Sequence, residues 1–110
     1  INYELGSAKL TAKSKTILDK HILAKLKEEP SSIVEVGSHT DSRGSTSTNQ
    51  NLSERRSKSV VEYLNQKGIK TSRMIAIGFG ESTLLNDCKD GVTCSESKHA
   101  KNRRTEFKFY

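Results

Sequence analysis

The sequence lacks any apolar run that approaches the roughly 20 residues a helix needs to cross a bilayer, so no membrane-spanning helix is predicted. Hydrophobic residues make up 32% of the 110 residues and aromatic residues only 5%, which limits the expected core to a small one. The apolar residues nevertheless fall in periodic clusters separated by turn signals, and this pattern argues against a disordered chain. The length suits one domain, which is predicted to cover residues 1–110.

The chain also lacks an initiator methionine and a signal-like apolar segment, because it begins at Ile1. This start predicts a domain excised from a longer protein. Acidic residues are the minority: 13 Asp and Glu stand against 19 Lys and Arg, which gives a net charge of +6. A basic surface favours anionic partners such as nucleic acid, anionic lipid or an acidic polymer, and the charge alone does not choose among them.

Hydrophobic periodicity predicts an α+β fold in the order β-α-β-α-β-β. Alternating or β-branched runs predict strands at residues 1–5, 33–36, 74–77 and 105–109. Helical periodicity predicts one helix over residues 9–29 and a second through Leu52, Arg56, Val60 and Leu64. The polar segments 41–51 and 81–102 are expected to be irregular. The economical architecture is a two-layer sandwich, with both helices packed on one face of a four-stranded mixed sheet.

A carboxylate and a guanidinium are expected to face the same crevice at the end of the second strand. Asp41 lies just after this strand, and Arg56 follows 15 residues later on the apolar stripe of the second helix. A charge on an inward-facing stripe needs a partner. One interpretation is an internal Asp41–Arg56 salt bridge that ties the loop to the helix. The alternative is a site open to a zwitterionic ligand, with Asp41 accepting from its ammonium group and Arg56 donating to its carboxylate.

Motifs in this region and beyond it carry a resemblance to a known family. They read His39-Thr40-Asp41, Gly44, Asn49, Leu52-Ser53, Arg56, Val60, Gly68-Ile69, Gly78-Phe79-Gly80-Glu81 and Asn102-Arg103-Arg104-Thr105-Glu106. In this order and spacing they resemble the OmpA-like peptidoglycan-associated domain, which is shared by OmpA C-termini, the peptidoglycan-associated lipoprotein and flagellar stator proteins. The resemblance extends over nearly the whole chain and implies the family's two-layer sandwich.

The resemblance also implies a ligand, the diaminopimelate residue of the peptidoglycan stem peptide, bound without cleavage and without a cofactor. The positions that match the family's main anchors are Asp41 and Arg56. Positions that line the same pocket are Thr40, Arg43, Asn49 and Leu52. Tyr3 and Glu4 resemble the aromatic-acidic pair that begins the family domain, although Glu replaces the usual Asp.

A domain of this family is expected in the periplasm of a diderm bacterium. Its parent protein would be membrane-attached and would anchor the outer membrane or an envelope complex to the cell wall. In such an exported domain, Cys88 and Cys94, which flank the turn signal Asp90-Gly91, predict a disulfide. A redox-active pair would usually show C-x-x-C spacing, which these two cysteines lack.

Other chemistries find weaker support in the residues. His39 and Asp41 alternate onto one strand face, but no third metal ligand follows at suitable spacing, since His21 and His99 lie elsewhere. Ser38, His39 and Asp41 are the residue types of a hydrolytic triad, yet adjacent strand positions cannot line up nucleophile, base and orienting acid. No metal site and no enzyme activity are therefore predicted.

A basic nucleic-acid-binding module is the alternative function, and the net charge of +6 is its only support. Such surfaces normally interleave aromatic with basic residues, whereas the few aromatic residues here are scattered or buried by pattern. The sequence therefore favours a cell-wall ligand over nucleic acid.

The doublet Arg103-Arg104 has two interpretations, because strand alternation sends its side chains to opposite faces. At least one arginine is expected to be structural and to pair with an acid such as Glu81. The other is left for contact with glycan or peptide.

Overall fold

The computed structural model describes residues 8–82, 84, 86, 88 and 93–110. Its first helix is continuous and consists of α1 (Ala12–Ile17), the π-helical stretch η1 (Leu18–Leu23) and α2 (Ala24–Glu28). The other helices are α3 (Thr46–Gln66), the 3-10 turn η2 (Thr71–Arg73) and α4 (Glu96–Asn102). The strands are β1 (Val34–Ser38), β2 (Met74–Gly78) and β3 (Thr105–Phe109). Across the described residues, no helix is both long and apolar enough to cross a membrane.

Polar side chains determine where the helices begin. Thr11, Ser45 and Ser95 each precede a helix and accept a hydrogen bond from the backbone N–H three residues later. Each contact satisfies one of the amide groups that the first turn of a helix leaves without a partner. At the other end of α3, Gly68 has a φ of +103°, a conformation that favours glycine after a helix.

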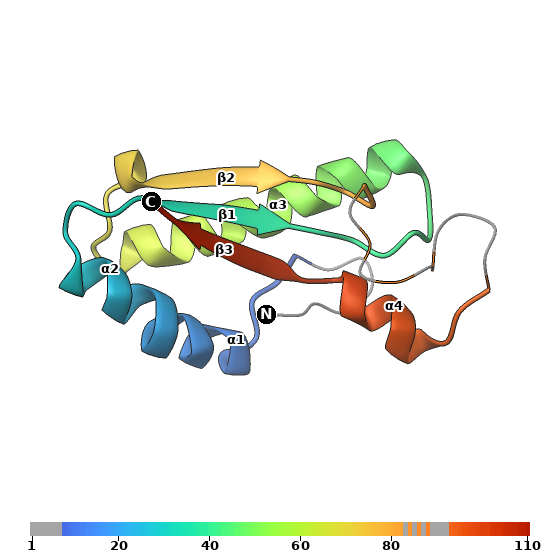
Figure 1. The fold of residues 1–110 in the computed structure, drawn as a ribbon, viewed down its shortest axis with the longest axis horizontal. Helices are drawn as coiled ribbons and strands as arrows, with labels where there is room; N and C mark the ends of the chain where they lie inside the picture. The colour runs from blue at the N-terminus through green and yellow to red at the C-terminus, as the bar shows by residue number, and fades with distance from the viewer. Residues whose placement is uncertain (1–7, 83, 85, 87, 89–92) are drawn as a thin grey trace.

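The sheet has β1 in its centre, flanked by β2 and β3 (Figure 1). β1 and β2 are parallel, with Val34 opposite Met74, and the chain passes from one to the other through α3. β1 and β3 are antiparallel, with Val34 opposite Phe109 and Ser38 opposite Thr105. The ends of β1 and β2 and the start of β3 therefore meet at one end of the sheet, which Figure 1 shows beside α4.

The hydrophobic core lies between the sheet and the two long helices. Val34 and Val36 project from the central strand and are fully buried. They pack in one cluster with residues of both long helices, the segment after α3 and β2: Leu18, Ile22, Leu23, Leu26, Val60, Leu64, Ile69 and Met74. Because side chains alternate along a strand, Glu35 and Gly37 lie on the opposite face of the sheet.

The expected α+β arrangement is present, but the sheet differs from the prediction. In the described part of the chain it has three strands where four were expected. The strand predicted at residues 1–5 lies outside the described residues. The helix predicted over residues 9–29 is shorter at both ends, because Thr11 caps it and Pro30 disfavours helical geometry at the residue before it.

Two helical segments were predicted to be irregular. α3 begins at Thr46, within the expected loop, because its Ser- and Thr-rich first turns have the composition of a loop but are capped by Ser45 and buried at Asn49. α4 lies within the segment expected to be irregular. Its seven residues carry no apolar stripe, and the side chains that it buries are His99 and Asn102.

Cys88 and Cys94 form the expected disulfide, with their Cα atoms 5.9 Å apart. The bond lies directly before Ser95, the residue that caps α4. It therefore ties the start of α4 to the segment that follows β2.

Replacing both cysteines by alanine should lower the free energy of unfolding by about 2 kcal/mol, because so short a closed loop restricts the unfolded chain only modestly. Urea denaturation of the wild type and the double variant measures the difference. Wild type treated with a reductant is the matched control and should lose a similar amount. Thiol titration of the denatured, non-reduced protein should detect no free thiol, and two free thiols would contradict the prediction.

Candidate ligand-binding site

A pocket of about 140 Å³ lies at the end of the sheet where β1 stops. The loop after β1 contributes Thr40, Asp41, Arg43 and Gly44 to its lining, and α3 contributes Thr48, Asn49, Leu52 and Arg56. Arg103, which directly follows α4, completes the lining. Asn49, Leu52 and Arg56 recur every three or four positions, so they share one face of the helix. The six described residues that the sequence placed in one site thus line one pocket, while Tyr3 and Glu4 lie outside the described residues.

The loop after β1 is held by hydrogen bonds to its own backbone. Asp41 Oδ1 accepts from the backbone N–H of Arg43 at 3.0 Å, and Gly44 takes a φ of +90° where the chain turns towards α3. Asn49 Nδ2 donates to the carbonyl oxygens of Asp41 at 3.3 Å and Arg43 at 3.0 Å. The buried Asn49 thereby ties the first turns of α3 to the loop and positions the Asp41 carboxylate.

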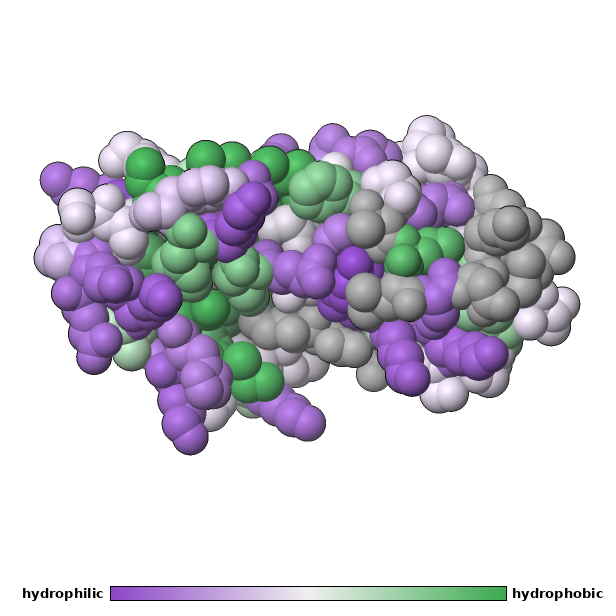
Figure 2. All heavy atoms as spheres, viewed as in Figure 1, coloured by the Kyte–Doolittle hydropathy of each residue, from purple (hydrophilic) through white to green (hydrophobic). Residues whose placement is uncertain are grey.

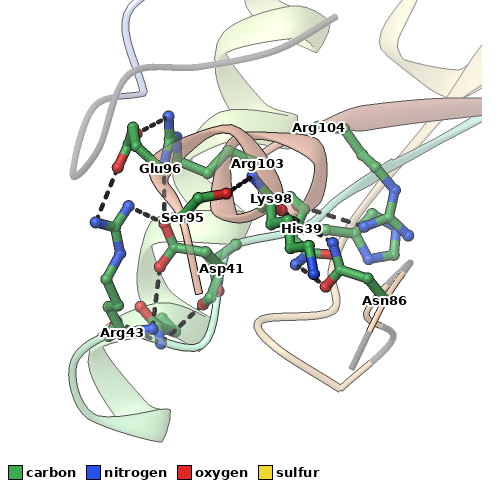
Figure 3. Close-up of polar contacts among 12 residues, drawn as sticks. His39, Asp41, Arg43, Asn86, Ser95, Glu96, Lys98, Arg103 and Arg104 are labelled. Atoms are coloured by element: carbon green, nitrogen blue, oxygen red, sulfur yellow. Dashed lines mark hydrogen bonds and ion pairs between the residues drawn. The ribbon is translucent and has the colours of Figure 1, made fainter. Parts of the chain in front are cut away.

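Asp41 lies in a network of alternating charges (Figure 3). Its side chain is 2% exposed, and Oδ2 accepts from Arg43 Nη2 at 2.8 Å and from Arg103 Nη1 at 3.1 Å. Both arginines also pair with Glu96, Arg43 at 2.9 Å and Arg103 at 2.6 Å. Because the Arg103 side chain is 5% exposed and that of Arg43 36%, Arg103 forms the buried side of the network and Arg43 its solvent side.

These contacts set the charge of the pocket. Burial by itself raises the pKa of the Asp41 carboxyl, but hydrogen bonds from Arg43 and Arg103 outweigh it and bring the pKa below its ordinary value. The pKa of Glu96 is lowered as well, first by the hydrogen bond from Arg103 and then by that from Arg43. Both carboxylates are therefore ionised at neutral pH.

Asp41 should make the fold sensitive to acid. Because its pKa is lower in the folded chain, its contribution to stability is present above the ordinary value of 3.8 and is lost as the pH falls through the folded value. We expect Asp41→Asn to be less stable than wild type at pH 7, and the gap to narrow as the pH falls below the ordinary value of 3.8. Burial also lowers the pKa of His39 from its ordinary value of 6.5. This histidine is present in both proteins, so its effect on stability below pH 6.5 is the same in both and leaves the gap unchanged. Urea midpoints at each pH test this, and a constant gap would contradict it.

Arg56 is fully buried on α3, and its Nη1 donates to the carbonyl oxygen of His39 at 2.9 Å. This contact joins α3 to the end of β1. Asp41 forms ion pairs with Arg43 and Arg103. The salt-bridge interpretation had assigned Arg56 to it as a partner. Asp41 and Arg56 line the same pocket from a loop and from a helix, as both interpretations require.

Arg103 and Glu96 are the residues of this network that sequence reasoning did not assign to it. An arginine of the doublet was expected to pair with an acid, for which Glu81 was the example. The structure pairs Arg103 with Asp41 and Glu96, and Arg104 with Glu106 at 3.4 Å, so both arginines have acidic partners. The doublet was therefore a usable sequence signal that Arg103 pairs with an acid. No sequence signal indicated Glu96, because it lies in a helix without an apolar stripe.

The neighbouring polar residues have structural contacts. Ser38 Oγ lies 2.7 Å from Thr105 Oγ1 and accepts from Ser57 Oγ at 2.8 Å, so it joins β1, β3 and α3. His39 Nε2 lies 3.0 Å from Glu106 Oε1 instead of facing Ser38 as a catalytic base. Among the described residues, no three His, Cys, Asp or Glu side chains gather as they would around a metal ion.

Comparison with known proteins places the chain in a family. The model of the OmpA family matches residues 2–99, which is most of the sequence. The chain belongs to the OmpA family. The family that the resemblance in the sequence indicated is thus confirmed.

Relatives of this OmpA-family chain are longer proteins. An outer membrane porin F from Pseudomonas fluorescens is 38% identical over 87 residues, which are 79% of this chain and 25% of that protein. A peptidoglycan-associated lipoprotein from Legionella pneumophila is 37% identical over 82 residues, 74% of this chain and 44% of that one. The chain thus spans less than half the length of either relative.

The fold is also that of a solved structure. The peptidoglycan-associated lipoprotein from Burkholderia pseudomallei superposes with a TM-score of 0.88 at 22% identity. The match covers 100% of this chain and 88% of that one. The likeness shows that the arrangement of helices and strands is shared.

Proposed function

We propose that this chain is a non-catalytic domain that binds cell-wall peptidoglycan through the diaminopimelate residue of the stem peptide. The observation that carries the proposal is the pocket lined by a positioned carboxylate, Asp41, and a buried guanidinium, Arg56. The relatives support the choice of polymer, because a sequence relative and a structural relative are both named peptidoglycan-associated lipoproteins.

The end group of diaminopimelate matches the two charges of the pocket. It carries an ammonium group and a carboxylate on one carbon, whereas the lysine of other cell walls ends in an ammonium group alone. Arg56 offers a planar guanidinium that donates two parallel hydrogen bonds to a carboxylate, and Asp41 accepts from the ammonium group. A site with one anion and one cation therefore discriminates between the two amino acids.

The ligand ammonium group takes the position of the Arg43 guanidinium at Asp41 Oδ2. Arg43 is the more exposed partner of Asp41, and it retains Glu96 when it leaves. Arg103 is buried and stays in place. The exchange of one cation for another keeps Asp41 paired, so binding creates no uncompensated buried charge.

The remaining pocket residues complete the site. Thr40, Asn49 and Leu52 line it around the aliphatic part of the ligand, and Tyr3 and Glu4 are proposed to add contacts from the N-terminal segment. The parent protein is proposed to be attached to the outer membrane, with this domain in the periplasm, so that binding anchors membrane to wall. A relative named as an outer membrane porin supports this placement.

Sedimentation with purified sacculi tests the proposed function. The domain should pellet with sacculi that contain diaminopimelate, should pellet much less with sacculi that contain lysine, and should release no soluble muropeptide. We expect a single-site affinity of about micromolar to millimolar, because one amino-acid end group buries little area, and the repeated sites of the polymer compensate. Equal retention on both kinds of sacculi would contradict the proposal. So would a loss of binding in salt as steep as that for DNA, the signature of a basic polymer binder.

A further inference from the structure

A second pocket, of about 260 Å³, lies on the face of the sheet opposite the core, where Glu35 and Gly37 of β1 lie. Its lining consists of Glu35, Gly37, His39, Phe79, Glu106, Phe107 and Lys108. It shares only the end of β1 with the first pocket. A volume just below the usual range for small-molecule sites suits a ligand about the size of one ring.

The floor of this second pocket is apolar and preformed. A Cβ atom at Gly37 would lie 2.7 Å from Cε2 of Phe79, so the ring lies directly over the glycine. His39 stacks on the same ring with centroids 5.0 Å apart and planes at 11°. The backbone N–H of Phe79 donates to the carbonyl oxygen of Ser38 at 3.0 Å, which holds the ring at the end of β1.

The rim of the second pocket carries hydrogen-bonding groups. Glu106 Oε1 contacts both His39 Nε2, at 3.0 Å, and Arg104 Nη2, at 3.4 Å. Among the residues that the structure describes, His39 Nδ1 is buried without a hydrogen-bond partner. Because burial lowers its pKa, His39 is neutral at pH 7, and with Nε2–H directed at Glu106 its Nδ1 is an acceptor. Glu35 and Lys108 stand opposite each other across β1 and β3.

We propose that the second pocket binds an N-acetylated hexosamine ring of the peptidoglycan glycan strand, an inference that rests on the proposed function. The aliphatic face of a pyranose ring packs on Phe79 and Gly37. Sugar hydroxyls donate to Glu35 and Glu106, and Lys108 donates to the acetamido carbonyl. A ligand with its own negative charge would meet two carboxylates, so the rim favours a neutral ligand rich in donors.

His39 connects the second pocket to the first. Its side chain lines the second pocket, its carbonyl oxygen accepts from Arg56, and Asp41 follows two residues later. Two residues of extended chain span about 7 Å, and the three stem-peptide residues from the sugar to diaminopimelate reach about 10 Å. The proposed muropeptide would pass this segment with its end group in the first pocket and its sugar in the second.

A second copy of this chain is the competing occupant of the same face. Ile75 is 45% exposed and lies opposite Glu35 in the sheet, so it faces the same side. Figure 2 shows hydrophobic residues gathered along the edge of the molecule over β2. The polar rim of the second pocket favours the sugar, because Glu35, Glu106 and Lys108 would lose water in a dry interface.

NMR titration with a neutral tetramer of N-acetylglucosamine tests the inference. Amide shifts should occur at Gly37, Phe79 and Glu106 and be absent at Leu52. Glu35→Gln and Phe79→Leu should each weaken tetramer binding by about 3- to 10-fold, as expected for one lost hydrogen bond or packing contact. Ile75→Ala is the matched control from the same face and should bind the tetramer as wild type does.

A parallel titration with free diaminopimelate separates this inference from the proposed function. Glu35→Gln and Phe79→Leu should bind diaminopimelate as wild type does. If wild type binds diaminopimelate but the tetramer shifts no amide on this face, the sugar site is wrong and the proposed function stands. If the tetramer binds and diaminopimelate does not, the proposed function fails.

Concentration-dependent dimerisation that Ile75→Ala abolishes would assign the face to a second copy. Glu35→Gln replaces a partly exposed side chain and keeps the test valid if Phe79→Leu fails to fold.

Discussion

Arg56→Lys should weaken the binding of a diaminopimelate tripeptide by about 30-fold or more, in a domain that still folds. Lysine keeps the positive charge and one donor for the His39 carbonyl, but it cannot offer a carboxylate two parallel N–H groups in one plane. Isothermal titration calorimetry measures the affinity, and circular dichroism checks the fold. Arg56→Ala is a poorer test, because Arg56 is fully buried and its removal also leaves a cavity and the His39 carbonyl without this donor.

The matched control for this prediction is Arg55→Lys. Arg55 is the adjacent residue on α3 and is exposed, so its replacement tests a general loss of arginine on the same helix. We expect Arg55→Lys to bind as wild type does. Wild-type affinity in a folded Arg56→Lys variant would remove Arg56 from the proposed site, and equal losses in both variants would show that the loss is not specific to position 56.

Gly78→Ala should lower the free energy of unfolding by about 3 kcal/mol, at the upper end of the usual cost of overpacking. A Cβ atom at Gly78 would lie 2.5 Å from the backbone nitrogen of Glu54 and 2.6 Å from Ser53 Oγ. The backbone of α3 cannot move aside as a flexible side chain can. The same face of α3 carries Asn49 and Arg56, so the displaced helix should also lose ligand affinity. Urea denaturation and calorimetric titration of the variant measure the two effects.

Gly37→Ala is the contrasting control for Gly78→Ala. Its added Cβ would meet the ring of Phe79 at 2.7 Å, and an aromatic ring can rotate or shift where a helix backbone cannot. We expect a clearly smaller loss of stability than for Gly78→Ala and unchanged binding of diaminopimelate. Equal losses in the two variants would show that the close approach of β2 to α3 has no special cost.

Periodic apolar residues were sufficient to predict most elements. Leu18, Ile22 and Leu26 predicted the first helix, and the alternation of Thr105–Phe109 predicted β3, because a helix or strand must present one apolar face whichever element covers it. The start of α3 and the whole of α4 were not predicted. Their sequences resemble loops, and contacts made in the folded chain, such as those of Asn49 with the loop after β1, hold them in place.

The residues of the first pocket were also largely accessible from the sequence. Asp41 follows a strand, and Asn49, Leu52 and Arg56 recur on one face of a helix, so local geometry and the family motif together bring them to one place. The second pocket was not predicted. Its lining comes from β1, β3 and the residue after β2, and no motif marks which strands become neighbours.

The sequence by itself determined which charged groups this domain has and which element carries most of them. Only the tertiary structure decided how they pair. Asp41 and Arg103 are 62 residues apart and meet at the end of the sheet beside which α4 lies, where Glu96 of α4 pairs with both Arg43 and Arg103. With 19 Lys and Arg in the chain, many pairings were open to Asp41. Distance and burial in the folded chain select among them, because the strength of an ion pair depends on both.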